Sequence, residues 1–174
     1  PAYMYGRPSP KQTKAYAATI VEEADFDISE ILEGYTGAVA KIYTNKPGPN
    51  IGFRFDIDAL TIRESKEETH RPAKEGFRSR NDKTCHACGH DGHTAILLSA
   101  AHYLAHHGRI DGTLQLVFQP AEETGSGASK MIEDGLFKRF PVDAIYGLHN
   151  WPGVPVGHFG FVDGPAMASV DWAR

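Results

Sequence analysis

The chain has 174 residues, of which 41% are hydrophobic and 23% charged, and its formal net charge is −4. This length suffices for one domain with a substantial core but not for two large ones, and the composition is that of an ordinary soluble globular protein. The acidic balance gives no reason to expect a nucleic-acid partner. The sequence shows neither an apolar stretch of ~18 residues nor a secretory signal, so we expect no membrane partner and a cytoplasmic location.

The N-terminal part of the chain is predicted to contain two helices followed by two strands. Residues 1–10 carry prolines without periodicity and are expected to form an arm. Helical spacing predicts a helix over 11–24 and a short one over 28–33. The pattern then changes to strands over 38–43 and 51–57, with a turn rich in Pro and Gly between them. We expect these two strands to form a hairpin.

The remainder of the chain alternates between helical and extended patterns. Residues 64–83 are strongly polar and predict a long irregular connection, which is uncommon in compact domains unless it is functional. Helices are predicted over 94–107 and 127–133, and strands over 113–118 and 142–148. The last strand is a nearly continuous apolar run, which is typical of a central strand buried on both faces.

Strands that alternate with helices predict an α/β fold with a mixed, mainly parallel sheet and flanking helices. Ligands of such sheets gather beyond the carboxyl ends of the strands. The chemically capable residues follow predicted strands or precede the helix over 94–107, and we expect them all at one edge: Asp56, Asp58, Cys88, His90, Glu122, Glu123 and His149. This sorting favours a functional site there.

Residues 85–93 read Cys-His-Ala-Cys-Gly-His-Asp-Gly-His, a density of thiol and imidazole groups that ordinary packing does not require. First-row metal ions prefer these donors, so a catalytic metal site is the favoured interpretation. Two alternatives stay open. Cys85 and Cys88 could be a redox pair of the thioredoxin kind or half of a structural zinc ribbon, although the chain has no other cysteine to complete a ribbon.

Glu122 and Glu123 are adjacent carboxylates after a predicted strand. Such a pair is usually a solvated turn. The alternative is a division of labour, because consecutive side chains of an extended segment point apart. One carboxylate could then bind metal while its neighbour takes a proton from water and returns it to a leaving amine.

Four segments together resemble the M20 family of metallopeptidases and amidohydrolases, in its aminoacylase-like branch. They are Phe-Asp-Ile-Asp-Ala-Leu at 55–60, His-Ala-Cys-Gly-His-Asp-Gly-His-Thr-Ala at 86–95, Phe-Gln-Pro-Ala-Glu-Glu at 118–123 and Gly-Leu-His-Asn-Trp-Pro at 147–152. They occur in family order within residues 35–165. The resemblance implies a hydrolase that removes an N-acyl group from an amino acid or a small peptide-like amide.

The resemblance also implies roles for individual residues. The metal ligands would be Cys88, His90, Glu123 and His149. In the intact enzyme they would help to hold two divalent ions, zinc, manganese or nickel. Glu122 would be the general base, and Asp58 would orient a ligand without touching the ion. Cys85 stands where relatives are expected to carry methionine, so we interpret it as a bystander or an oxidation site. The expected partners are a small N-acyl amino acid and further copies of the chain.

The resemblance further implies that the chain is an N-terminal fragment of a two-domain enzyme. Residues 1–165 would be a partial catalytic domain, and residues 166–174 would begin a lid or dimerisation domain. The last histidine ligand of the family would lie beyond Arg174, so the fragment alone is expected to be a poor enzyme. The alternative from another functional class is a truncated, catalytically silent module that binds metal or a partner.

Overall fold

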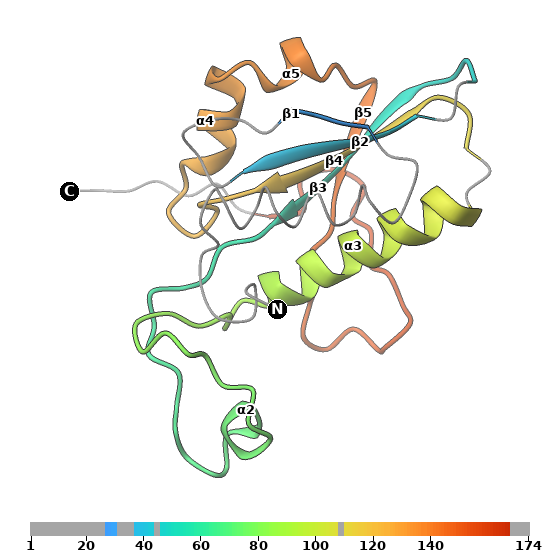
Figure 1. The fold of residues 1–174 in the computed structure, drawn as a ribbon. Coiled ribbons are helices and arrows are strands. Elements are labelled where there is room, and N and C mark those ends of the chain that lie inside the picture. The colour runs from blue at the N-terminus through green and yellow to red at the C-terminus, as the bar shows by residue number, and fades with distance from the viewer. Residues whose placement is uncertain (1–26, 31–36, 44–45, 108–109, 168–174) are drawn as a thin grey trace.

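The computed structural model describes residues 27–30, 37–43, 46–107 and 110–167 (Figure 1). The expected arm and the expected helix over 11–24 lie outside these residues. The described chain forms a five-stranded sheet with helices. The strands are β1 (Asp27–Glu30), β2 (Ala38–Tyr43), β3 (Asn50–Asp56), β4 (Thr113–Gln119) and β5 (Ala144–Gly147). The helices are α2 (Arg71–Lys74), α3 (His90–His107), α4 (Gly127–Glu133) and α5 (Leu136–Arg139).

The strands lie in the order β1-β2-β4-β3-β5. β3 pairs in parallel with both β4 and β5, whereas β2 pairs antiparallel with both β1 and β4. Of the described strands, β2 therefore runs against all the others. The expectation of an α/β fold with a mixed, mainly parallel sheet is confirmed.

The side chains of β4 alternate between the two faces of the sheet, and on each face they belong to an apolar cluster that a helix helps to form. Leu114, Leu116 and Phe118 pack on one face with Leu97 and Ala101 of α3. On the other face, Val39 and Val117 pack with three side chains from α4, α5 and the residue after α5, namely Met131, Leu136 and Phe140. Figure 1 shows α3 on one side of the sheet and α4 and α5 on the other. Each fully buried side chain of this size stabilises the fold by about 1.5–3 kcal/mol.

The expected hairpin of the second and third strands is wrong. β4 lies between β2 and β3 and pairs with each along its length, from Thr113 to Phe118 against β2 and from Thr113 to Gln119 against β3. The reason is burial. Six of the seven β4 residues are buried. A strand that is buried on both faces lies in the interior of a sheet, where it pairs with a neighbouring strand on each side.

Two further expectations are corrected at the edges of the sheet. Residues 28–30 of the expected helix over 28–33 instead belong to strand β1, which pairs with β2, because pairing with the sheet overrides a weak local helical pattern. The expected central strand over 142–148 is β5, which among the described strands pairs with β3 alone. Ile145 and Tyr146 are 42% and 57% exposed. The apolar composition of this strand therefore did not mean that it is buried on both faces of the sheet.

The segment between β3 and α3 is irregular, as expected, apart from the single turn of α2. It is closed at its base by two backbone hydrogen bonds between Leu60 and Cys85, of 3.0 and 3.1 Å. Further out, the carboxylate of Glu64 accepts the Ser79 amide and lies 3.0 Å from His70 Nε2. Burial alone would raise the pKa of Glu64, but these partners outweigh burial and hold that pKa below its usual value. Among the described helices, none has the length and apolarity to cross a membrane.

Glu64 is expected to keep this connection folded. Replacing Glu64 by Ala leaves the Ser79 amide and His70 without their acceptor, at a cost of about 1–3 kcal/mol. We expect trypsin to cleave this variant within residues 61–84 at least several-fold faster than the parent chain. Glu68→Ala, at an exposed position of the same segment, is the control. Equal cleavage rates for all three proteins would contradict this role.

Candidate metal centre

The carboxyl ends of the parallel strands carry the acidic and imidazole groups of the candidate site. Asp56 ends β3 and Asp58 follows it, Glu122 and Glu123 follow β4, and His149 follows β5. The first turn of α3 adds two histidines, His90 and His93, and Cys88 lies in the preceding turn. Because β3, β4 and β5 point the same way, their ends converge, and the expected sorting of these residues to one edge is confirmed.

The turn that carries Glu122 and Glu123 is built by tight backbone contacts. Ala121 adopts a positive φ of 53°, a conformation that non-glycine residues rarely take. The Gly127 amide donates to Ala121 O at 3.1 Å, and the Gly125 amide donates to Glu122 O at 2.9 Å. A Cβ on Gly127 would lie 1.6 Å from the carbonyl oxygen of Pro120. The small residue at the start of α4 therefore lets the chain fold back beneath the two carboxylates.

Asp58 connects His90 to this carboxylate turn. His90 Nδ1 lies 2.9 Å from the backbone oxygen of Asp58 and 3.3 Å from its Oδ1, while Asp58 Oδ2 accepts the Glu123 amide at 3.0 Å. Because these partners are acceptors, the proton of the neutral His90 ring resides on Nδ1. The lone pair of Nε2 then points into the site. Asp58 thus contacts the nitrogen of His90 that does not face the site.

Two buried ligand atoms at the centre have no hydrogen-bond partner. These are His90 Nε2 and Glu123 Oε1, which lie 3.8 Å apart. Buried polar atoms are normally paired, and leaving one unpaired costs about 1–3 kcal/mol. An ion between them would satisfy both atoms.

Cys88 and His149 meet on the other side of the same centre. Cys88 Sγ lies 3.6 Å from His149 Nε2, and His149 Nδ1 lies 2.7 Å from the backbone oxygen of Asn150. The Nδ1 proton of a neutral ring is donated to that carbonyl, so Nε2 presents its lone pair toward the thiol. The structure therefore brings together all four residues expected to bind metal.

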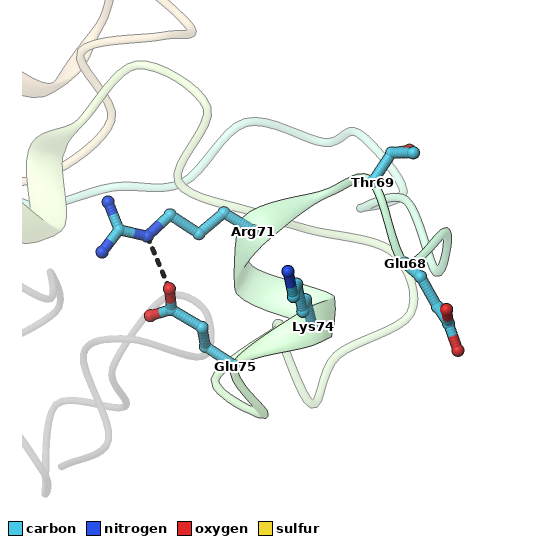
Figure 2. A pocket seen from close by; sticks show the side chains of 5 residues that line it. All are labelled: Glu68, Thr69, Arg71, Lys74 and Glu75. Atoms are coloured by element: carbon cyan, nitrogen blue, oxygen red, sulfur yellow. Dashed lines mark hydrogen bonds and ion pairs between the residues drawn. The ribbon is translucent and has the colours of Figure 1, made fainter.

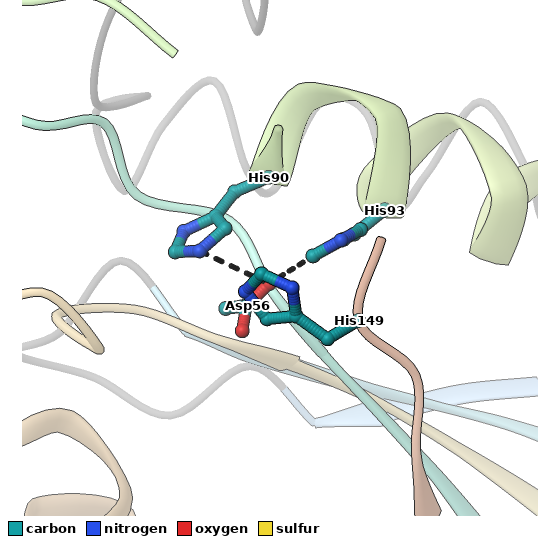
Figure 3. A group of neighbouring side chains, drawn as sticks. All are labelled: Asp56, His90, His93 and His149. Carbon is teal, nitrogen blue, oxygen red and sulfur yellow. Dashed lines mark hydrogen bonds and ion pairs between the residues drawn. The ribbon is translucent and has the colours of Figure 1, made fainter. Parts of the chain in front are cut away.

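Asp56 and His93 belong to the same cluster, although the motifs that predicted the site gave neither residue an individual role (Figure 3). Asp56 Oδ1 lies 2.5 Å from His93 Nδ1 and 3.7 Å from His90 Nε2, and both residues are almost fully buried. Two sequence signals could have indicated a role for each. Asp56 precedes Asp58 by two residues, the repeat of a strand, and His93 follows His90 by three residues, nearly one turn of a helix.

The electrostatics of the centre favour a bound cation. Burial, followed by the charges of Glu123 and Glu122, raises the pKa of Cys88 from 9.0 to about 11. Burial also raises the pKa of Glu123; a protonated His90 ring would oppose this shift, and the charge of Glu122 adds to it. Negative charge at these two groups is therefore disfavoured by their surroundings, and a positive ion would reverse that balance.

The donor set fits divalent metal ions. Ligand atoms of Cys88, His90 and Glu123 lie within 4.8 Å of one another, and so do those of Asp56, His90, His93 and His149. His90 is common to both groups. Thiolate, imidazole and carboxylate together suit borderline first-row metals such as zinc.

A hollow of the described surface lies beside α2 and lacks such chemistry. Figure 2 shows its five lining residues, Glu68, Thr69, Arg71, Lys74 and Glu75. Arg71 Nε donates to Glu75 Oε1 at 2.7 Å, so two of the charges compensate each other. The lining contains no thiol or imidazole, and the sheet edge remains the candidate site.

Comparison with known proteins gives an independent result. Residues 52–173 match the model of peptidase family M20/M25/M40. The chain is 43% identical over 152 residues to an N-acetylcysteine deacetylase of Bacillus subtilis, which covers 87% of this chain and 38% of that protein. It is 41% identical over 159 residues to a hippurate hydrolase of Campylobacter jejuni, which covers 91% and 39%.

A solved structure of another protein has a similar fold. The YXEP protein of Bacillus subtilis, described as a dinuclear metal-binding peptidase of the M20 family, superimposes with a TM-score of 0.79 and 38% sequence identity. The match covers 94% of this chain and 44% of that one. The chain thus spans about two-fifths of the length of these relatives. The resemblance inferred from the four sequence segments is confirmed.

Gly127 offers a test of how the carboxylate turn is built. A Cβ 1.6 Å from backbone Pro120 O cannot be accommodated by a side-chain movement, so the turn itself must shift. We expect Gly127→Ala to lower the free energy of unfolding by about 2 kcal/mol or more, at the upper range for overpacking. The control is Gly92→Ala in α3, where a Cβ would meet no atom within 4 Å and where alanine favours the helix. Urea unfolding of both variants measures the difference, and equal stabilities would contradict the close approach.

Proposed function

The chain belongs to peptidase family M20/M25/M40, and on that basis we propose that it carries part of the active site of a metal-dependent amidohydrolase. The reaction would remove an N-acyl group from an amino acid or a small peptide-like amide. The observation that carries the proposal is the pair of buried, unpartnered atoms His90 Nε2 and Glu123 Oε1, 3.8 Å apart, beside the Cys88–His149 contact.

The proposed ligands are Cys88, His90, Glu123 and His149. His90 and His149 each give the Nδ1 proton to a backbone carbonyl and keep the Nε2 lone pair, an arrangement typical of metal-binding histidines. Glu123 is held by its amide on Asp58, which orients His90 from the opposite side. When bound, two divalent ions, zinc, manganese or nickel, would polarise the amide carbonyl. The dinuclear description of the YXEP protein supports the number of ions.

Glu122 is the proposed general base. It follows directly on the positive-φ residue Ala121 in the tight turn, and its charge is close enough to raise the pKa of Cys88. In this role its carboxylate takes a proton from the attacking water and passes that proton to the departing amine. Glu123, the next residue, is held beside the buried centre because its backbone amide donates to Asp58.

The substrate class is supported by the relatives rather than by a pocket. The N-acetylcysteine deacetylase and the hippurate hydrolase are both named for amino acids that carry an N-acyl group. Which acyl group and which amino acid are preferred depends on contacts outside the described cluster.

The first test concerns metal ligation. Replacing Cys88 by Ser should weaken zinc binding by about 10-fold or more, or about 1.4 kcal/mol, because a hydroxyl is a far poorer ligand than a thiolate. Cys85→Ser is the matched control, since Cys85 lies three residues away with its backbone bonded to Leu60. Zinc competition against a chelator measures both affinities. Equal losses in the two variants would favour a site built from both cysteines.

The second test concerns catalysis, in the encoded protein that contains this chain. Glu122→Gln should keep its metal and lose about 10²-fold or more in turnover of an N-acetyl amino acid, the usual scale of general-base catalysis. Glu123→Gln should lose metal as well. Wild-type turnover in Glu122→Gln would remove this residue from the mechanism. Bound metal with no turnover in the parent protein would favour the alternative of a silent metal-binding module.

A further inference from the structure

The third imidazole of the cluster, His93, differs from the other two in what its ring nitrogens contact. We propose that His93 is a positioning residue rather than a metal ligand, and that it holds the segment carrying His149 onto the metal centre. This inference rests on the proposed function, because it takes His149 to be a ligand.

Both ring nitrogens of His93 are engaged by the protein. Nδ1 lies 2.5 Å from Asp56 Oδ1, and Nε2 lies 2.9 Å from the backbone amide of Asn150. An amide can only donate, so Nε2 must accept and cannot carry a proton. The ring proton is then on Nδ1 and is donated to the buried carboxylate. This assignment leaves His93 no lone pair for an ion.

His90 and His149 show the opposite arrangement. In each ring, Nδ1 faces a backbone carbonyl, and Nε2 faces the centre without a backbone amide on it. His93 lies close to both, with ring centroids 5.3 Å from His90 and 4.7 Å from His149. Proximity alone would therefore make His93 a candidate ligand, and only the direction of its hydrogen bonds separates it from its neighbours.

The segment that follows β5 needs such an anchor. From residue 150 to residue 167 every residue is exposed, and none lies in a helix or strand. His149 therefore sits on a segment with little packing of its own. The amide of Asn150 is bonded to His93, whose side chain is 1% exposed in the first turn of α3.

A second contact docks the same residue on the metal-binding turn. Gly89 has a positive φ of 88°, and a Cβ there would lie 2.6 Å from Asn150 Oδ1. The Asn150 side chain thus lies directly over the backbone between Cys88 and His90. The Asn150 amide is bonded to His93 and the Asn150 side chain lies against Gly89, while the adjacent His149 ring lies 3.6 Å from Cys88 Sγ.

The decisive measurement uses the unaltered chain with ¹¹³Cd²⁺ as the metal probe and ¹⁵N-labelled histidine. We expect ¹¹³Cd–¹⁵N coupling to Nε2 of His90 and of His149, no coupling to His93, and long-range ¹H–¹⁵N spectra that show His93 as the Nδ1–H tautomer. Coupling to His93 together with His90 would overturn the inference and leave the proposed function standing. Coupling to no histidine would overturn both.

Variants test the anchoring role. His93→Ala should keep the same number of Zn²⁺ ions at saturation but bind them about 10- to 100-fold more weakly, the range for residues that orient ligands. His93→Gln retains an amide oxygen that can accept the Asn150 amide and should recover part of the loss. Ser99→Ala, at an exposed position of α3, is the control. Unchanged zinc affinity in His93→Ala would overturn the proposal, as would loss of a full ion equal to that of His149→Ala.

Discussion

Two buried carboxylates at the end of β3 constrain everything around them. Asp56 is 0% and Asp58 5% exposed, and an ionised carboxylate is stable in such surroundings only when hydrogen bonds or charges compensate for lost water. Burial alone would raise the pKa of each, yet the partners outweigh it and lower both values. For Asp56 the largest of these partners is His93, and for Asp58 it is His90. The need to compensate two buried charges therefore draws the start of α3 to the end of β3.

The same requirement orients the proposed metal ligands. His90 Nδ1 lies 2.9 Å from the backbone oxygen of Asp58, and the Asp58 carboxylate accepts the Glu123 amide, so one residue contacts a proposed ligand from α3 and a proposed ligand from the turn after β4. Asp56 is bonded on its far side to Arg54, which also donates to Gln119 at the end of β4. An imidazole ring whose Nδ1 is already hydrogen-bonded loses little conformational freedom when its Nε2 binds an ion. This is the physical basis of preorganised metal sites.

Sequence patterns predicted the individual helices and strands better than they predicted which strands lie side by side in the sheet. Leu114, Leu116 and Phe118 revealed β4, and the motif at 118–123 placed the two glutamates after it. The short connection between β2 and β3 could not predict that β4 lies between them. Strand pairing depends on which strands are buried in the complete sheet. His93 was missed for a related reason. Its motif places it beside His90, but only the three-dimensional arrangement shows that its Nε2 meets the Asn150 amide.

The two cysteines show how environment decides between chemistries that share a motif. A redox pair needs a thiol whose pKa is lowered by positive charge or a helix N-terminus. Here burial and then the charge of Glu64 raise the pKa of Cys85, and burial with nearby glutamates raises that of Cys88 to about 11. Without a cation both thiols are held protonated. Cys85 lies at the base of the loop opposite Leu60, whereas the sulfur of Cys88 faces His149. A divalent ion would supply the missing positive charge at Cys88, so the surroundings that oppose redox chemistry are those that favour a metal ligand.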